Sequence, residues 1–429
     1  MTNITLTLKN NFLGFWQQSW KRIVLFLAVF GPATITAMAD NDATGVATYS
    51  ISGAQLGYPI LFLLVIITLL LAITQEMGMR LTLVTRRGLA DLIREKYGVR
   101  AAVFMFLALF IANIGTIIAD LAAVKATSGM IGLPALPAVM VVLVIAFLLI
   151  TKGDYKLTQR LMLLSSLFFF AYIFSAVKAS PDWGLAMSNL LYPQGVQPTP
   201  DYIRNYLIIG MGVLGTTITP WGQFFISSFA SDKRIDRENI IYSQLETYWG
   251  AILTNFFSFF MIVATAATLF VHHIPLVSGE QAALAIAPFA GDLAGKMFAA
   301  GIINAGFMGL VVVSLSTAYA FAEFFGVPGS LNDSFKDSKP FYILYILQLA
   351  IAFVTVLFPQ VSFFQLVVGT QVINAIALPF IFYYLIKLTN DRTMMREFAN
   401  NAFQRGFAVA CTVVIVVASV FTVASSFLG

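Results

Sequence analysis

Three polar residues interrupt the first long apolar segment of the chain and could bind a cation. The apolar run 23–39 meets Asp40, Asn41 and Asp42, and apolar residues resume after Gly45. A charged side chain near the centre of a bilayer costs roughly 3 kcal/mol, so it usually faces a cavity, a partner or an ion. We therefore expect Asp42 to be the main ion ligand. Asp40 is either a second carboxylate near the ion or its path, or a partner for the helix end at this break.

A second interruption lies inside the apolar segment 206–230, where Thr216, Thr219 and Pro220 occur close together. Two broken segments in corresponding places of two halves indicate the midplane binding site of an inverted-repeat transporter. The hydroxyls of Thr216 and Thr219 are candidate ligands, although either could instead bond back to its own helix.

The remaining candidate ligands also offer oxygen atoms to a metal ion. Gln371 could be a ligand or a gate residue, and the Asn374 amide could bind the ion or bridge two helices. Unwound backbone offers carbonyl oxygens as well. Oxygen ligands suit magnesium and manganese, and magnesium is typically held through waters by one or two carboxylates. The complete candidate set comprises Asp42, Thr219, Thr216, Gln371, Ala39, Gly45, Asp40 and Asn374.

Composition identifies the setting in which these residues act. The 429 residues are 59% hydrophobic and 10% charged, and the mean hydropathy is +0.86. A soluble domain carries about 25% charged residues, so the chain is predicted to be an all-α polytopic membrane protein. The single cysteine, Cys411, excludes an intrachain disulfide and a multi-cysteine metal site. Neither a nucleophile–base pair nor a phosphate loop occurs, so we expect no enzyme and no bound cofactor.

Apolar runs of about 20 residues predict eleven membrane spans. Spans one to five (23–178) and six to ten (204–388) form two halves, joined by a loop at 179–203; a tail precedes them at 1–22, and a loop with the eleventh span follows at 389–429. The spans begin near Ile23, Pro59, Ala101, Leu133, Leu157, Tyr202, Thr247, Leu293, Phe341, Val361 and Gly406.

The basic residues predict the orientation of these spans. All but four of the 25 Lys and Arg residues fall on the side of the N-terminus. Positive residues collect in cytoplasmic loops, so we expect a plasma-membrane protein with a cytoplasmic N-terminus and an extracellular C-terminus. The positive net charge thus reflects basic residues in cytoplasmic loops, and no nucleic-acid partner is expected. The aromatic-rich segment 12–20 either lies along the membrane surface or is a plain tail.

Several motifs resemble the NRAMP family of divalent metal transporters. They are Gly31-Pro32-Ala33, then Gly53-Ala54-Gln55-Leu56-Gly57-Tyr58, and Thr370-Gln371-Val372. The resemblance implies a LeuT-like fold of 5 + 5 inverted repeats, in which helices 1 and 6 are broken, and transport by alternating access.

The departures from the family pattern concern the ion ligands. Where the family has D-P-G-N, this chain has Asp42-Ala43-Thr44-Gly45, so the asparagine ligand is replaced by Gly45. The family methionine is Thr219, its first histidine is Trp221, and its second is Ile226. An acidic residue that the family associates with proton passage is Ala123, while Asp120 remains. This pattern resembles the NRAMP-related magnesium transporter clade.

These features predict a secondary transporter of hydrated or partly hydrated Mg²⁺, and also of Mn²⁺, that works without proton coupling. Histidine is the usual proton carrier near neutral pH, and His272 and His273 are predicted to lie in an external loop. The expected partners are the divalent ion and the lipid bilayer, with the protein a monomer. Alternatives are a proton-coupled Mn²⁺ or Fe²⁺ symporter, a sodium-coupled amino-acid carrier of the same fold, or a channel.

Other polar residues in the spans have more ordinary interpretations. Asp120 with Lys125 is expected to be a structural or vestibule feature. Glu76 and Glu323 are expected to be vestibule carboxylates or members of helix-end ion pairs. Trp221 either lines or plugs the inner path.

Overall fold

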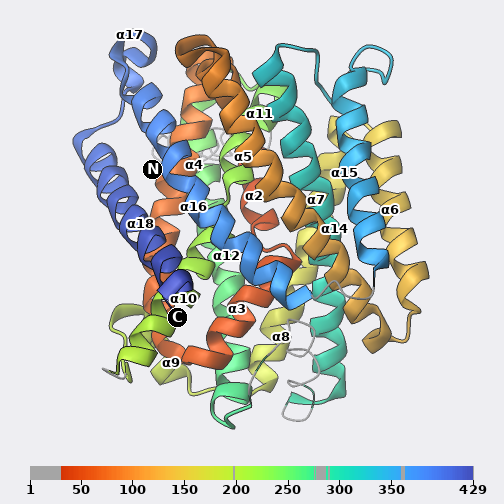
Figure 1. Cartoon of the computed structure of the whole chain (residues 1–429), viewed down its shortest axis with the longest axis vertical. Coiled ribbons are helices and arrows are strands. Elements are labelled where there is room, and N and C mark those ends of the chain that lie inside the picture. The colour runs from red at the N-terminus through yellow and green to blue at the C-terminus, as the bar shows by residue number, and fades with distance from the viewer. Residues whose placement is uncertain are drawn as a thin grey trace, which may run out of the picture.

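Helices account for the regular structure in the described part of the chain (Figure 1). The computed structural model describes residues 30–428 except 197–198, 275, 277–286, 288–289 and 359–362. The predicted surface segment 12–20 lies outside these residues. The principal helices are α2 (Pro32–Ala39), α3 (Ala43–Leu56), α4 (Leu61–Thr85), α5 (Leu89–Thr127), α6 (Ala135–Lys152), α7 (Tyr155–Ser165), α8 (Phe170–Lys178), α9 (Trp183–Leu191), α10 (Pro200–Thr217), α11 (Pro220–Lys233), α12 (Ile240–Thr265), α14 (Asp292–Phe325), α15 (Lys339–Leu357), α16 (Phe363–Asn390), α17 (Arg392–Met395) and α18 (Ala402–Leu428).

The described helices correspond to the predicted spans, and the expected starts of the first and tenth spans, Ile23 and Val361, lie outside the described residues. Within the described residues, nine helical stretches are long and apolar enough to cross a membrane. The two predicted broken spans supply the other two, as the pairs α2/α3 and α10/α11. One boundary differs clearly: α5 begins at Leu89, well before the expected start at Ala101. Gly98 has φ +81 inside α5, so a charged first segment is joined through a kink to the apolar span.

The first break is fixed by caps on both sides. Pro32 begins α2 directly after Gly31, whose φ is +142. Asp42 caps α3, accepting a hydrogen bond from the backbone N–H of Gly45 at 2.7 Å. Between the two half-helices, Asn41 donates to Thr254 of α12 (2.9 Å to its hydroxyl) and accepts from Ser258 at 2.9 Å. The break is therefore anchored to α12.

The second break has the same construction. After α10, Ile218 leaves the helical region with φ −114 and ψ 90. Thr219 then caps α11, accepting from the N–H of Gly222 at 3.1 Å, and Pro220 occupies the first turn. Proline is favoured there because its missing N–H would be unpaired anyway.

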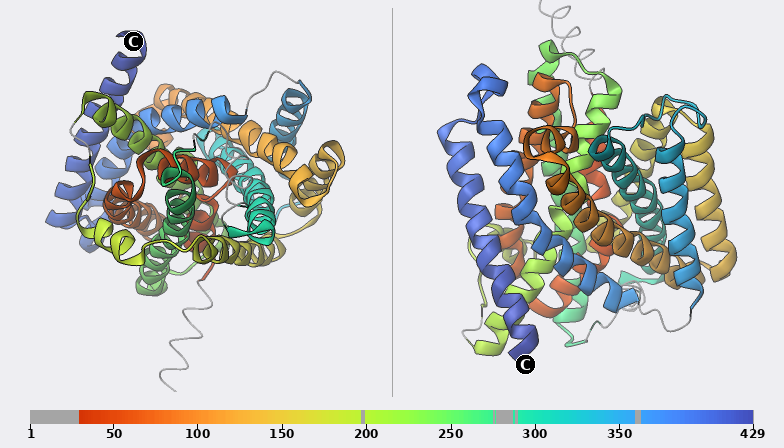
Figure 2. Two further views of the ribbon diagram at one scale, coloured as in Figure 1. Left: turned by 90° about the horizontal axis from the view of Figure 1, so that it is seen from below. Right: turned by 45° about the horizontal axis from the view of Figure 1, so that its top comes forward.

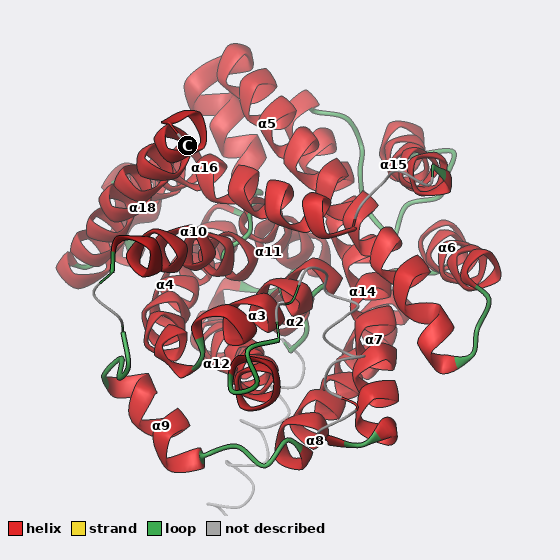
Figure 3. Ribbon diagram, turned by 60° about the horizontal axis from the view of Figure 1, so that its bottom comes forward, coloured by secondary structure: helices red, strands yellow, loops and turns green. Residues whose placement is uncertain are grey.

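Both breaks lie in the interior of the bundle. Figure 3 shows α2, α3, α10, α11 and α12 surrounded by other helices, with α6, α15, α18 and α9 towards the outside. Figure 2 shows α18, the deep blue helix, along one flank. α12 packs on both α2 and α3, and α11 packs on α2, α4 and α14. The two interrupted spans are thus placed where their unwound segments are shielded by protein, as irregular backbone at membrane depth requires.

Candidate functional site

Asp42 lies at the centre of the candidate site. Its side chain is 1% exposed. Its Oδ1 accepts hydrogen bonds from the Thr44 hydroxyl at 2.6 Å and from Gly45 N at 2.7 Å. These donors hold the carboxylate at the N-terminal end of α3, where the helix dipole favours negative charge. The sequence analysis identified Asp42 but missed Thr44, which lies two residues further along.

Gly45 lets oxygen atoms approach closely beside this carboxylate. A methyl group there would lie 2.6 Å from the Asp40 carbonyl oxygen, 3.2 Å from Thr216 Oγ1 and 3.4 Å from Asp42 Oδ1. The Thr216 hydroxyl is buried and has no hydrogen-bond partner. Three oxygen atoms from both breaks therefore surround the side of Gly45 that has no side chain. We call these atoms, with Gly45, the oxygen cradle.

The backbone carbonyl in the oxygen cradle is that of Asp40. The predicted Ala39 carbonyl accepts a hydrogen bond from Asp42 N at 3.0 Å, which closes the turn after α2. A carbonyl oxygen has two lone pairs, so Ala39 stays a predicted ligand.

The α16 amides approach the site through Thr44. Gln371 donates from Nε2 to Thr44 Oγ1 at 2.8 Å, and Asn374 donates to Gln371 Oε1 at 3.2 Å. A continuous chain of hydrogen bonds thus links Asn374, Gln371, Thr44 and Asp42. The Asn374 carbonyl oxygen has no partner. Gln371 is adjacent to the site as expected, and Asn374 lies one step behind it.

Thr219 and Asp40 form a separate contact on the α11 side of the break. Thr219 Oγ1 donates to Asp40 Oδ1 at 2.9 Å and caps α11 at the same time. Gln75 of α4 donates from Nε2 to Asp40 Oδ2 at 3.3 Å. Asp40 lies at the C-terminal end of α2, and its side chain accepts from Thr219, the residue that caps α11. Its carboxylate joins the two breaks, while its carbonyl faces Gly45.

Asp120 is closer to the site than the sequence indicated. Its Oδ1 accepts from Thr44 N at 3.2 Å, whereas its Oδ2 is buried without a partner. Gly309 of α14 makes room, because a methyl there would overlap the Asp120 carboxylate. The expected pairing with Lys125 is wrong, since that ammonium donates to the Val356 carbonyl at 2.7 Å. Asp120 thus belongs with Asp42, because the packing of α5 on α3 and α14 brings it there.

The site is acidic and closed to solvent. Asp40, Asp42 and Asp120 form no ion pair within the described residues. The same residues contain no group of three His, Cys, Asp or Glu side chains that could enclose a metal.

Trp221 is buried in the first turn of α11. Its side chain is 0% exposed, and its carbonyl accepts from Ser316 of α14 at 2.8 Å. Its indole N–H is buried without a partner. Phe224 and Phe225 of the same helix are also buried.

The remaining acidic residues in the spans have structural roles or face a vestibule. Glu76 is fully buried and forms an ion pair with Arg80 at 2.7 Å, which confirms the second of its two expected roles, a helix-end ion pair. Glu323 accepts from Ala90 N at 3.2 Å and lines a polar cavity of about 550 Å³. His272 and His273 are exposed in a turn, as predicted.

A buried carboxylate that the sequence analysis missed positions the first half-helix. Glu246 of α12 accepts from Gly31 N at 2.7 Å and from Thr34 N at 3.0 Å. It thereby satisfies backbone donors at the start of α2. No local pattern reveals this contact, because its partners lie more than 200 residues apart in the chain.

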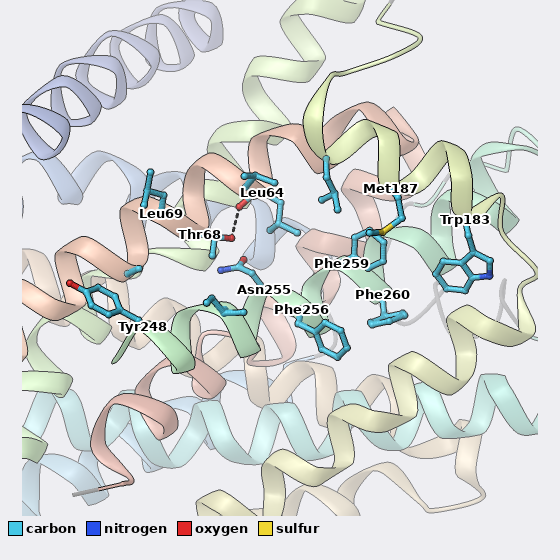
Figure 4. A pocket seen from close by; sticks show the side chains of 14 residues that line it. Leu64, Thr68, Leu69, Trp183, Met187, Tyr248, Asn255, Phe256, Phe259 and Phe260 are labelled. Atoms are coloured by element: carbon cyan, nitrogen blue, oxygen red, sulfur yellow. Dashed lines mark hydrogen bonds between the residues drawn. The ribbon is translucent and has the colours of Figure 1, made fainter. Parts of the chain in front are cut away.

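A large groove elsewhere is chemically unsuited to an ion. Figure 4 shows this groove of about 730 Å³ between α4, α9 and α12, lined by residues such as Leu64, Phe256 and Phe259. Asn255 and Thr68 are among its few polar residues, and Thr68 donates to the Leu64 carbonyl at 2.6 Å. The groove cannot replace the hydration shell of a cation, so the two breaks remain the candidate ion site.

Comparisons with known proteins agree on family and fold. Residues 33–425 match the sequence profile of the family described as "Natural resistance-associated macrophage protein-like" (Nramp). A divalent metal cation transporter MntH of Bradyrhizobium diazoefficiens is 23% identical, over 97% of this chain and 92% of the relative. The Levilactobacillus brevis protein of the same name is 20% identical, over 96% and 90%.

Solved structures show the same architecture. A mutant of the Eremococcus coleocola manganese transporter superposes with a TM-score of 0.77 at 20% identity, covering 94% of this chain and 88% of that one. A Na⁺-coupled sialic acid symporter gives a TM-score of 0.58 at 10% identity, covering 91% and 88%. These likenesses establish the predicted LeuT-like arrangement with broken helices 1 and 6.

Proposed function

Because the chain belongs to the Nramp family of divalent metal transporters, we propose that it moves Mg²⁺, and also Mn²⁺, across the plasma membrane without coupling to protons. The observation that carries this proposal is the oxygen cradle. In the cradle the Asp42 carboxylate, the Asp40 carbonyl and the unpartnered Thr216 hydroxyl gather at the face of Gly45 that has no side chain. A cation in that space would replace the missing partner of Thr216.

The donor set supports a hard cation. A thioether selects softer transition metals, whereas carboxylate, hydroxyl and carbonyl oxygens suit magnesium and manganese. Thr219 stands where the family methionine would be, and it bonds to Asp40. Magnesium sheds its water reluctantly, and glycine in place of the family asparagine adds no side chain between these oxygens. The Mn²⁺ activity is also in keeping with the manganese transporter named among the solved structures.

Transport follows from the position of the site between four half-helix ends. The ion binds where α2 and α3 meet α10 and α11, so a movement of either half of a broken span opens the site to one side. Entry of a divalent ion is favoured by about 4.6 kcal/mol per 100 mV of membrane potential, because two charges cross. That driving force makes a coupled proton unnecessary.

A proton-coupled Mn²⁺ symporter is the second candidate, and one observation favours it. Asp120 has a buried, unpartnered Oδ2 and is held against Thr44, next to Asp42. A carboxylate in that position could accept a proton as the ion binds.

Uptake into proteoliposomes separates the two candidates. Mg²⁺, Mn²⁺, Ca²⁺ and Cd²⁺ are offered in turn, and internal pH is recorded with a trapped dye at a fixed membrane potential. Uptake of Mg²⁺ and Mn²⁺ without acidification supports the proposal. Uptake of Mn²⁺ or Cd²⁺ with acidification and without Mg²⁺ flux would establish the coupled symporter.

A further inference from the structure

We infer that the chain holds a second cation position at the Asp40 carboxylate, separate from the oxygen cradle, through which the transported divalent ion passes. This inference rests on the proposed function, because its occupant is the same ion. Asp40 contributes its carbonyl to the oxygen cradle and its carboxylate to the opposite side, towards α4 and the first turn of α11. One residue therefore belongs to both positions.

The charge of Asp40 is the first argument. The side chain is 1% exposed, and no Lys, Arg or His forms an ion pair with it in the described chain. Its polar contacts are two neutral donors, the Thr219 hydroxyl at 2.9 Å and the Gln75 amide at a longer 3.3 Å. A buried carboxylate is stable only when it is paired, neutralised or bound to a metal. A cation at this position would supply the missing positive charge.

The unpartnered amide oxygens are the second and independent argument. Gln75 and Gln223 are both 0% exposed, and the carbonyl oxygen of each has no hydrogen-bond partner. The Gln75 amide group already touches Asp40. Gln223 lies one turn after Thr219 and donates to Thr74, the neighbour of Gln75, at 3.4 Å. A buried polar atom without a partner is unfavourable, and a cation beside Asp40 would satisfy the Gln75 oxygen.

Gly222 lets the groups at this position pack closely. A methyl group there would lie 2.7 Å from Thr219 Oγ1 and 3.3 Å from Asp40 Oδ1. The oxygens in contact are the Asp40 carboxylate and the Thr219 hydroxyl, and the unpartnered Gln75 oxygen belongs to the amide that bonds to Asp40. Such oxygen ligands suit a hard divalent cation. The Asp40 position lies on the α11 side of the break, at the first turn of that helix.

Counting bound Mn²⁺ by electron paramagnetic resonance tests the second position. Purified wild-type protein is expected to bind two Mn²⁺ at saturation, Asp40→Asn and Asp42→Asn one each, and the double variant none. Asparagine keeps the volume of Asp40 and an oxygen that can accept from Thr219, so the fold is preserved. Glu323→Gln, a carboxylate-to-amide change in α14 at a contact with Ala90 of α5, away from both breaks, is the matched control and should still bind two.

A gain of affinity provides a second readout. Gln75→Glu is nearly isosteric and adds a carboxylate facing Asp40, so it should tighten binding of the second Mn²⁺ at least tenfold while leaving the first unchanged. A structural role for Gln75 would not produce this gain. If the wild-type protein transports Mn²⁺ but binds only one ion, and Asp40→Asn also binds one, the second cation position is refuted while the proposed function stands. Wild-type protein that neither binds nor transports a divalent ion would overturn the proposed function as well.

Discussion

Thr219 donates its hydroxyl hydrogen bond to Asp40, at 2.9 Å, and not to Asp42. The same oxygen caps α11 by accepting from Gly222 N. Thr216, three residues earlier, has a buried hydroxyl with no partner beside Asp42. Two threonines that look equivalent in the sequence therefore have different roles. Thr219 holds the breaks together, and Thr216 is available to the ion in the cradle.

Replacing each threonine by valine should show that Thr219 contributes to the stability of the fold and Thr216 to the affinity for Mg²⁺. Thr219→Val removes a helix cap and a hydrogen bond to a carboxylate, and should lower the free energy of unfolding by about 2 kcal/mol. Thr216→Val breaks no hydrogen bond and should leave stability unchanged, while weakening Mg²⁺ binding about tenfold, or about 1.4 kcal/mol. Thermal unfolding and isothermal calorimetry check the two effects. Equal loss of affinity without loss of stability in both variants would refute the assignment.

Filling the oxygen cradle should block the ion. A methyl group introduced by Gly45→Ala meets the Asp40 carbonyl at 2.6 Å, a distance that forces the backbone of the break to move. Uptake of Mg²⁺ should fall at least a hundredfold. Gly212→Ala is the matched control, since its methyl would sit 3.5 Å from Thr48 inside α10. It should keep uptake and stabilise the helix by about 0.5–1 kcal/mol. Normal uptake by Gly45→Ala would show that the ion binds elsewhere.

The hydrogen bonds that link Asn374 and Gln371 of α16 to Thr44 should influence the affinity for Mg²⁺ by orienting the Thr44 hydroxyl. Gln371→Leu removes the donor to Thr44, leaving its hydroxyl free to turn away from Asp42. We expect the Michaelis constant for Mg²⁺ to rise about tenfold, a loss of about 1.4 kcal/mol. Asn374→Leu, one step further out, should have a smaller effect. The idea fails if Asn374→Leu impairs uptake more than Gln371→Leu does.

A pH-dependent contact joins the loop after α16 to α5. The ionised Asp391 accepts hydrogen bonds from Lys96, which has the larger effect, and from Thr393. These bonds lower the pKa of the Asp391 carboxyl from 3.8 to about 2. A lowered folded-state pKa contributes stability above about pH 4, which is lost as pH falls through about 2. Asp391→Asn should therefore lower the free energy of unfolding by about 1 kcal/mol at pH 7. Unfolding curves of the two proteins should converge near pH 2; a gap that persists there would contradict this account.

The breaks were predictable because their causes are local. Asp42 and Pro220 cannot continue an apolar helix, and both now sit at the start of a half-helix. The apolar runs predicted the spans. The start of the third helix was missed because a charged helical segment joins the apolar span at Gly98. Local propensity and hydropathy thus predict the elements well.

The partners inside the site were not predictable, because they depend on packing between distant segments. Asp120 contacts Thr44 only because α5 lies against α3, and Glu246 reaches Gly31 from α12. The position of the Asp40 carbonyl beside Gly45 likewise depends on the turn between the half-helices. Candidate ligands follow from residue types, whereas the contacts between them required the three-dimensional structure.

The most direct test is Mg²⁺ uptake into proteoliposomes by the wild type and by Asp42→Asn, at a fixed membrane potential and with internal pH recorded in the same vesicles. We predict saturable wild-type uptake without acidification, and loss of that uptake in Asp42→Asn protein that unfolds at the wild-type temperature. Uptake that persists in Asp42→Asn, or wild-type Mg²⁺ uptake accompanied by acidification, would contradict the account.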